Sequence, residues 1–363
     1  MTVKDIVSEL EKLAPLSCQE SYDNAGLIVG DPEAEASSAI LCFDISEEII
    51  DEAIGKKANL VISHHPVIFG GLKKINGKTA TERIVIRAIK NNIALYAAHT
   101  NLDGVQGGIS TVLAEKLGLS EIKILSYSEK RLFKIVTFVP EAYSEKVRHA
   151  MFEAGAGHTG NYDSCSYNIE GTGTFRGGEN TNPFAGKRGL LCSEPEIRIE
   201  TIAKKENLDT VISALKQSHP YEEPAYDVYQ LENRFENAGM GAVGVLPEYM
   251  DASEFLAKIK RILPVKIIRH NDLYKKVKTV AVCGGSGSGY VSEAIAAGAD
   301  IFLTGDCKYH QFLDCRNRII LADAGHFESE YFAVEIFFSI INKKFPNFAA
   351  DLACGIFNPV QYF

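Results

Sequence analysis

The sequence predicts a mixed α/β protein in which two α/β halves with mostly parallel sheets flank an inserted α+β domain. Short apolar strands alternate with amphipathic helices before residue 127 and again after residue 233, which is typical of β-α-β units. The segment between them has a different order of elements. At 363 residues the chain is also too long for one ordinary core. We therefore expect a domain interrupted by an insertion, with the parts at 1–126, 127–233 and 234–363.

The first half opens with a helix. Thr2 and Asp5 resemble a helix-capping pair, and apolar residues at helical spacing continue as far as Pro15. Residues 22–30 indicate a turn that leads into a strand, where Asp23 or Asn24 is either a turn former, the reading we favour, or a site residue. The strands expected next are 40–44, 60–63 and 93–98, and the helices are 46–57, 80–90 and 109–117.

The middle segment predicts a ferredoxin-like domain, because two β-α-β units follow each other with an additional pair of strands. We expect 176–195 to be an exposed loop. The segment 219–224, His-Pro-Tyr-Glu-Glu-Pro, is interpreted as a rigid turn, with a polar binding segment as the alternative. The strands expected are 132–139, two within 165–175, 196–203 and 226–231, and the helices are 143–154 and 208–219.

The last part returns to the α/β pattern and contains a glycine-rich turn. We expect a helix at 252–262 and strands at 265–268, 277–283, 300–304 and 319–322. The turn at 284–289 lies between a strand and a helix from Tyr290, where backbone N–H groups can approach an anion. It lacks the lysine of a P-loop, so it indicates only a candidate substrate-binding segment. The candidates are Gly284, Gly285, Ser286 and Gly287.

Composition excludes several classes of function. Asp and Glu outnumber Lys and Arg by 47 to 38, and the formal charge of −9 opposes binding to nucleic acid. No apolar stretch is long enough to span a membrane, and the acidic, amphipathic amino terminus does not resemble a signal peptide. The eight cysteines form no C-x-x-C pair, so we expect reduced thiols and a cytoplasmic protein.

Two adjacent histidines, His64 and His65, follow the strand expected at 60–63. The carboxyl ends of parallel strands are where open α/β sheets bind ligands. Neighbouring side chains of an extended segment point to opposite faces, so the two rings can serve two different centres. The alternative is that one ring is an ordinary hydrogen-bonded loop histidine.

Further ligand-type side chains follow other predicted strands. Asp103 follows the strand at 93–98, and His326 and Glu330 lie four residues apart on a helix that follows the strand at 319–322. Such a helical pair is often only a solvated face. Together, however, three imidazoles and two carboxylates could hold two divalent ions if one carboxylate bridges them, and mixed nitrogen and oxygen ligands suit zinc, iron(II) or manganese. Residues that could orient these ligands or move protons, unless they are caps or core groups, are His99, Asp306 and His310.

Five short motifs in this order resemble those of the NIF-three-like family, catalogued as GTP cyclohydrolase I type 2 homologues. The motifs are SHHP at 63–66, HTNLD at 99–103, GGSGSG at 284–289, TGD at 304–306 and GHFESE at 325–330. The resemblance implies two divalent metals, zinc first, between the two halves, with Glu330 as a bridge. It also implies that 127–233 is a PII-like or CutA-like insertion and that the chain forms a toroidal homohexamer. The ligands implied are His64, His65, Asp103, His326 and Glu330.

Two functions fit these expectations. The first is a metal-dependent hydrolase that acts on a nucleotide-like or phosphate-bearing small molecule, in which metal-activated water attacks a polarised centre. The second is a non-enzymatic regulatory or scaffold protein whose insertion senses a small ligand or recruits a partner. The GTP cyclohydrolase name belongs to the family, and no residue pattern in the sequence specifies guanine or a triphosphate.

Overall fold

The computed structural model describes residues 1–128, 131–233, 235–355 and 357–363. The chain divides into two compact units. Unit 1 contains 1–127 and 236–363, and unit 2 contains 128–235.

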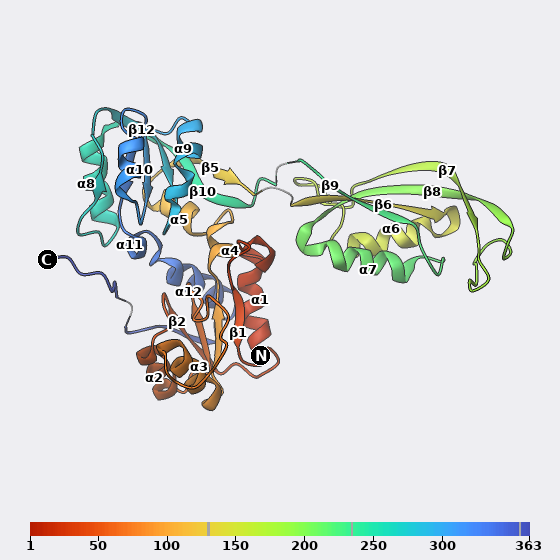
Figure 1. Ribbon diagram of the computed structural model, residues 1–363, viewed down its shortest axis with the longest axis horizontal. Helices are drawn as coiled ribbons and strands as arrows, with labels where there is room; N and C mark the ends of the chain where they lie inside the picture. Colours follow the sequence, from red (N-terminus) through yellow and green to blue (C-terminus); the bar gives the residue numbers. More distant parts are fainter. Residues whose placement is uncertain (129–130, 234, 356) are drawn as a thin grey trace. The chain divides into compact units, whose positions relative to one another are not determined.

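The first sheet of unit 1 has the strand order β1-β4-β3-β2-β15. The last four are parallel, and β1 is antiparallel to β4. Alternate residues of the buried strands face opposite sides, so helices cover both faces (Figure 1). Helices α1 (Val3–Leu13) and α12 (Ala333–Lys344) pack on one face, and α2 (Glu47–Lys56) and α3 (Ala80–Lys90) pack on the other. The strands are β1 (Gly26–Val29), β2 (Ser38–Cys42), β3 (Leu60–Ser63), β4 (Ala94–Ala97) and β15 (Ala349–Leu352).

The second sheet of unit 1 is mixed, with the order β11-β14-β13-β12-β10-β5. Only β12, β13 and β14 are parallel to each other, so the expectation of a mostly parallel sheet is wrong here. The strand expected at 265–268 is also wrong. Val265 donates its N–H to the carbonyl of Leu263 (2.7 Å) in a tight turn, and the strand forms later. The strands are β5 (Ser120–Tyr127), β10 (Gly239–Asp251), β11 (Arg269–His270), β12 (Lys276–Val282), β13 (Ile301–Thr304) and β14 (Ile320–Asp323).

The two sheets exchange strands between the two ends of the chain. β15, from the carboxyl-terminal part, pairs with β2 in the first sheet, whereas β5, from the amino-terminal part, pairs with β10 in the second. One continuous apolar core joins both sheets, and it includes Leu41, Tyr96, Val282 and Leu303. The two parts of the sequence therefore do not fold as two separate layers.

Shorter elements surround these sheets. The remaining helices of unit 1 are α4 (Thr100–Asp103), α5 (Ile109–Lys116), α8 (Ala252–Ile262), α9 (Val291–Ala296), α10 (Tyr309–Asp314) and α11 (His326–Glu330). The 3₁₀ turns of the chain are η1 (Leu16–Cys18), η2 (Glu141–Tyr143), η3 (Lys205–Asn207) and η4 (Gly287–Tyr290). Across the described ranges, no helix has the length and apolar character needed to span a membrane.

Unit 2 has the element order β-α-β-β-α-β and the antiparallel strand order β7-β8-β6-β9, which is the ferredoxin-like arrangement. Both of its helices lie on the same face of the sheet (Figure 1). They contribute to one apolar core. The expected loop at 176–195 is partly wrong, because β8 starts at Leu191 and pairs with the end of β7. The elements are β6 (Leu132–Pro140), α6 (Ser144–Glu153), β7 (Ser166–Arg176), β8 (Leu191–Lys204), α7 (Leu208–Ser218) and β9 (Tyr226–Gln230).

Candidate metal centre

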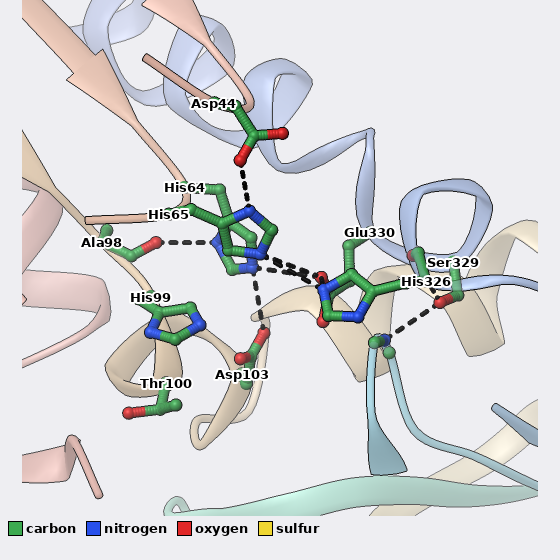
Figure 2. Close-up of polar contacts among 12 residues, drawn as sticks. Asp44, His64, His65, Ala98, His99, Thr100, Asp103, His326, Ser329 and Glu330 are labelled. Atoms are coloured by element: carbon green, nitrogen blue, oxygen red, sulfur yellow. Dashed lines mark hydrogen bonds and ion pairs between the residues drawn. The ribbon is translucent and has the colours of Figure 1, made fainter. Parts of the chain in front are cut away.

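The carboxyl ends of strands from both sheets of unit 1 bring histidines and carboxylates together (Figure 2). His64 and His65 directly follow β3, whose four residues are all buried. Asp103 ends the short helix α4 after β4. His326 and Glu330 begin and end α11, which follows β14. The five side chains thus come from two sheets but lie around one point.

The carboxylate of Glu330 is the centre of this cluster. Its Oε2 atom lies 3.0 Å from His326 Nε2, 3.5 Å from His64 Nε2 and 3.6 Å from His65 Nε2. Asp103 Oδ1 lies 3.8 Å from His64 Nε2. All three imidazoles therefore direct the same nitrogen atom towards one carboxylate oxygen.

The innermost atoms of the cluster have no hydrogen-bond partner. His64 Nε2, Asp103 Oδ1 and Glu330 Oε2 are buried and unsatisfied. A buried polar atom without a partner costs free energy, and such atoms are rare in folded proteins. A bound cation would satisfy all three at once, so the residues present fit a metal ion.

Each histidine ring is held by a second contact on its Nδ1 atom. His64 Nδ1 lies 2.8 Å from the carbonyl oxygen of Ala98. His65 Nδ1 contacts Asp44 (2.8 Å), His99 Nδ1 contacts Asp23 (2.7 Å), and His326 Nδ1 contacts Asp306 (2.8 Å). A carbonyl or carboxylate at Nδ1 leaves the lone pair of Nε2 available for a metal ion and fixes the plane of the ring.

Among the residues that the structure describes, three overlapping groups could hold an ion. They are His64, Asp103 and Glu330; His65, His326 and Glu330; and His64, His65 and His99. Glu330 belongs to two of these groups, which is the arrangement that a bridging carboxylate requires. The third group adds His99 to the possible ligands.

When no metal is bound, the carboxylates of the cluster favour protonation of His65 and His326. Burial lowers the pKa of His65 and His326, but the carboxylates of Asp44 or Asp306 and of Glu330 outweigh it and raise these pKa values to about 9 and about 10. Burial raises the pKa of Glu330, but the three nearby imidazoles outweigh it and hold this pKa well below its usual value. Metal ions and protons therefore compete for the same atoms.

The two neighbouring carboxylates, Asp103 and Asp23, have pKa values that are shifted in opposite directions. Burial, together with the charge of Glu330, raises the pKa of Asp103 well above its usual value. Burial also acts to raise the pKa of Asp23, but hydrogen bonds from His99 and Thr100 lower it to about 2. Asp23 therefore favours its ionised form behind His99, whereas ionisation of Asp103 is disfavoured by burial and would be favoured by a nearby cation.

The glycine-rich turn supports Glu330. The N–H of Gly285 donates to Ser329 Oγ (2.9 Å), and the N–H groups of Gly284 and Gly287 donate to the hydroxyls of Ser110 and Thr304. Gly285 has a φ of +57°, and a Cβ atom there would lie 2.0 Å from Glu330 Oε1. Ser286 is the cap residue of η4, and the turn packs against Glu330. Three of its N–H groups already donate hydrogen bonds within the protein.

The other candidate residues have different surroundings. Asp306 lies behind His326 as its partner, whereas His310 is exposed on α10 and its ring contacts Tyr309. The sequence reasoning did not single out Asp44, and it favoured a turn-forming role for Asp23. Asp44 could have been found from its position after β2, a strand that neighbours β3.

A cavity of about 620 Å³ opens beside the cluster. His65 and His326 line it, together with Phe43 and Arg269. Segments after β14 and near the carboxyl terminus, including Glu328 and Tyr362, close another side. Gly284, Gly285, Ser286 and Gly287 are not among its lining residues. A small molecule in this cavity would reach the candidate metal ligands from the side of His65 and His326.

Fold and cluster together define a mixed α/β protein with a site suited to divalent metal ions. The sequence profile of the Duf34/NIF3 (NGG1p interacting factor 3) family matches residues 1–358, and the chain belongs to this family.

Curated relatives and solved structures agree with this assignment. A protein of Halalkalibacterium halodurans named GTP cyclohydrolase 1 type 2 homolog is 40% identical over 324 residues, which cover 88% of this chain and 87% of the relative. A Bacillus subtilis protein of the same name is 37% identical over 357 residues, which cover 97% of this chain and 94% of the relative. The crystal structure of a Bacillus cereus protein related to NIF3 is 37% identical and has a TM-score of 0.81, covering 100% of this chain and 99% of its own.

Proposed function

We propose that this protein is a dinuclear metal-dependent hydrolase that acts on a small phosphate-bearing or nucleotide-like molecule. The observation that carries the proposal is the buried Glu330 carboxylate, which faces three imidazole nitrogens beside an open cavity. A site that only stabilises a fold is normally closed by its protein ligands, whereas a catalytic site keeps an accessible side.

The residues divide naturally between two ions. His64 and Asp103 would hold one, His65 and His326 the other, and Glu330 would bridge them. Zinc is the first candidate because it accepts mixed imidazole and carboxylate ligands, and iron(II) and manganese are alternatives. When bound, such ions supply Lewis acidity and a nucleophile derived from water at neutral pH.

The cavity supports an anionic substrate once the ions are present. Its lining contains four acidic residues, Asp44, Asp306, Asp323 and Glu328, against the single arginine Arg269. Without metal these four carboxylates outnumber the cationic groups of the lining even when His65 and His326 carry protons, whereas two divalent ions would add positive charge and favour phosphate. Arg269 is ion-paired with Asp323 and donates to the carbonyl of Cys307 (3.0 Å), so it is oriented at the cavity wall. We propose that it contacts the anionic group of the substrate.

Turnover by the full-length protein tests this proposal. Metal-free protein is reconstituted separately with zinc, manganese and iron(II), and each form is given GTP, other nucleotides, phosphodiesters and cyclic amides. We expect hydrolysis of at least one class, and its loss in Glu330→Gln but not in the matched surface variant Glu335→Gln, whose carboxylate is exposed and pairs with Lys116. Failure of every metal form to turn over any class, with two ions bound per chain, would contradict the hydrolase.

A regulatory role is the second candidate, and it rests on unit 2. This unit has its own core and the ferredoxin-like strand order, which supports a PII-like or CutA-like insertion. Under this proposal the metal centre stabilises an assembly, and unit 2 responds to a ligand or partner. We also propose a toroidal homohexamer, on the family resemblance, and light scattering of the purified protein measures its mass directly.

A further inference from the structure

Unit 2 contains a second cavity, of about 520 Å³. It shares no lining residue with the candidate metal centre. The end of β7, the segment 177–184 and the turn at 221–225 contribute to its lining. A cavity of this size is in the range that holds small organic ligands. The turn belongs to the His-Pro-Tyr-Glu-Glu-Pro segment, so this segment is part of a cavity wall.

Aromatic rings form one side of this cavity. The ring of Tyr221 lies 5.7 Å from that of Phe175 and 6.0 Å from that of Phe184, measured between centroids. Phe138 lines the cavity as well, and the Arg198 guanidinium lies 5.8 Å from its ring. Aromatic faces pack against flat apolar groups and attract cations.

A buried carboxylate points into the same space. Glu196 is only 8% exposed, and its Oε1 atom accepts a hydrogen bond from the hydroxyl of Tyr221 (2.8 Å). Burial, together with this bond, raises the pKa of the Tyr221 phenol, so the phenol remains a donor. The second oxygen, Oε2, lies against Gly173, where a Cβ atom would be 2.1 Å away. Glycine at this position leaves room for the carboxylate.

The charge of Glu196 has no cationic partner among the residues that the structure describes. Arg198 also lines the cavity, but its Nε and Nη2 atoms donate to Glu200 at 2.9 and 2.8 Å. The cavity lining as a whole has four glutamates, Glu170, Glu196, Glu222 and Glu223, against two arginines, Arg176 and Arg198. A buried ionised carboxylate is costly unless a cation accompanies it.

We propose that this cavity binds a small organic cation, in which an ammonium or amidinium group contacts Glu196 and an apolar or aromatic body lies among Phe175, Phe184 and Tyr221. The carboxylate favours a cationic donor over an anion, and the rings favour an apolar body over a bare metal ion. The segment that carries Phe184 is fastened where the backbone N–H of Asn182 donates to Glu222 (2.8 Å), so this contact holds one wall of the cavity in place. The proposal is independent of the hydrolase proposed for unit 1.

Calorimetric titration of the full-length protein with benzamidine tests the proposal, with phenethylamine as a second cationic probe. Benzamide and benzoate serve as the neutral and anionic controls of similar shape. A chelator is present throughout, so that metal ions contribute nothing. We expect one benzamidine per chain and binding at least about tenfold weaker for benzamide, because only the cation pairs with the carboxylate.

Variants connect this binding to the cavity. Glu196→Gln should remove the preference for the cation, and Phe184→Ala, a change at a half-exposed ring, should weaken both cationic probes. Glu153→Gln is the matched control, because this glutamate is 75% exposed on α6 of the same unit. The proposal is overturned if neither cation binds up to about 10 mM, if benzoate binds as well as benzamidine, or if folded Glu196→Gln retains the preference.

Discussion

The Nε2 atoms of His65 and His326 lie 3.3 Å apart, although one residue follows a strand of the first sheet and the other follows a strand of the second. Both rings are fixed from behind, by Asp44 and Asp306, and both face Glu330. Two imidazolium rings at this distance would repel each other. A cation bound at these two nitrogens would displace their protons, and the repulsion between the rings would be lost with them.

In the proposed dinuclear centre, Glu330 should control the occupancy of both metal positions. In Glu330→Gln the bridging charge is lost, so we expect the metal content after reconstitution to fall well below that of the unchanged protein, measured by elemental analysis. Glu335→Gln, an exposed change on α12, should keep its metal. Equal metal content in the two variants would show that Glu330 does not bridge.

Asp44 should matter for metal affinity although it is not a proposed ligand. It holds His65 Nδ1 at 2.8 Å, and loss of such a supporting carboxylate typically costs about 10- to 100-fold in affinity. We expect Asp44→Asn to lower zinc affinity by this order, measured by competition with a chromogenic chelator. Asp51→Asn, which removes only a surface pair with Arg87, is the control. Unchanged affinity in Asp44→Asn would mean that His65 needs no support.

Unit 2 should be removable without loss of metal binding. Tyr127 of β5 and Gly239 of β10 are direct antiparallel partners, so the two ends of the excised segment already lie side by side. We expect a chain in which a short Asn-Gly linker replaces 128–235 to form a hairpin from these strands and to bind as much metal as the intact chain.

Elemental analysis of the shortened protein gives the answer, and circular dichroism shows whether it has folded. Glu330→Gln in the shortened chain is the matched control for specific binding. A folded shortened protein that cannot hold metal would assign unit 2 a direct role in the centre.

The stability of unit 2 should decrease in mild acid because of His219. Burial lowers the pKa of His219, and the contact between its Nε2 and the Phe138 carbonyl (3.0 Å) only partly opposes this effect. Because the folded pKa is below the ordinary value of 6.5, the unfolded chain binds the proton more readily. Stability is therefore complete above about pH 6.5 and is lost as the pH falls towards the folded pKa.

The titration of the His219 ring, followed by NMR, checks this directly and should give a pKa below 6.5. His219→Gln cannot titrate, so it should flatten the acid side of the thermal unfolding profile of unit 2. Because Tyr221 N–H donates to His219 Nδ1 (3.0 Å), some loss of stability at neutral pH is also expected. A measured pKa at or above 6.5 would contradict this account.

Local patterns in the sequence were sufficient to predict much of the secondary structure. The helix at 80–90 was predicted with its observed bounds, because its apolar residues recur at helical spacing. In the structure the Thr79 side chain caps this helix by accepting a hydrogen bond from the backbone N–H of Glu82. The strand at 60–63 was predicted from the short apolar run that ends at Ile62. The α/β class is confirmed by the sheets and by the related structures.

Pairing over long distances could not be predicted in this way. β15 pairs with β2, and β10 runs between β5 and β12, but neither choice leaves a local pattern, because the partners lie far away in the sequence. The support of His65 by Asp44 also depends on two strands being neighbours. Such relationships are set by packing in three dimensions, whereas periodicity reports only which face of one element is apolar.

The exchange of strands between the sheets also sets an order of events when the chain is synthesised. Residues 128–235 are complete before β15 is made, so unit 2 can close its sheet while the first sheet of unit 1 still lacks its last strand. His64 and His65 must wait for His326 and Glu330, which are made after unit 2 is complete. The candidate metal site therefore forms only after synthesis has passed Glu330, and a cation that needs all five side chains could be bound only from that point on.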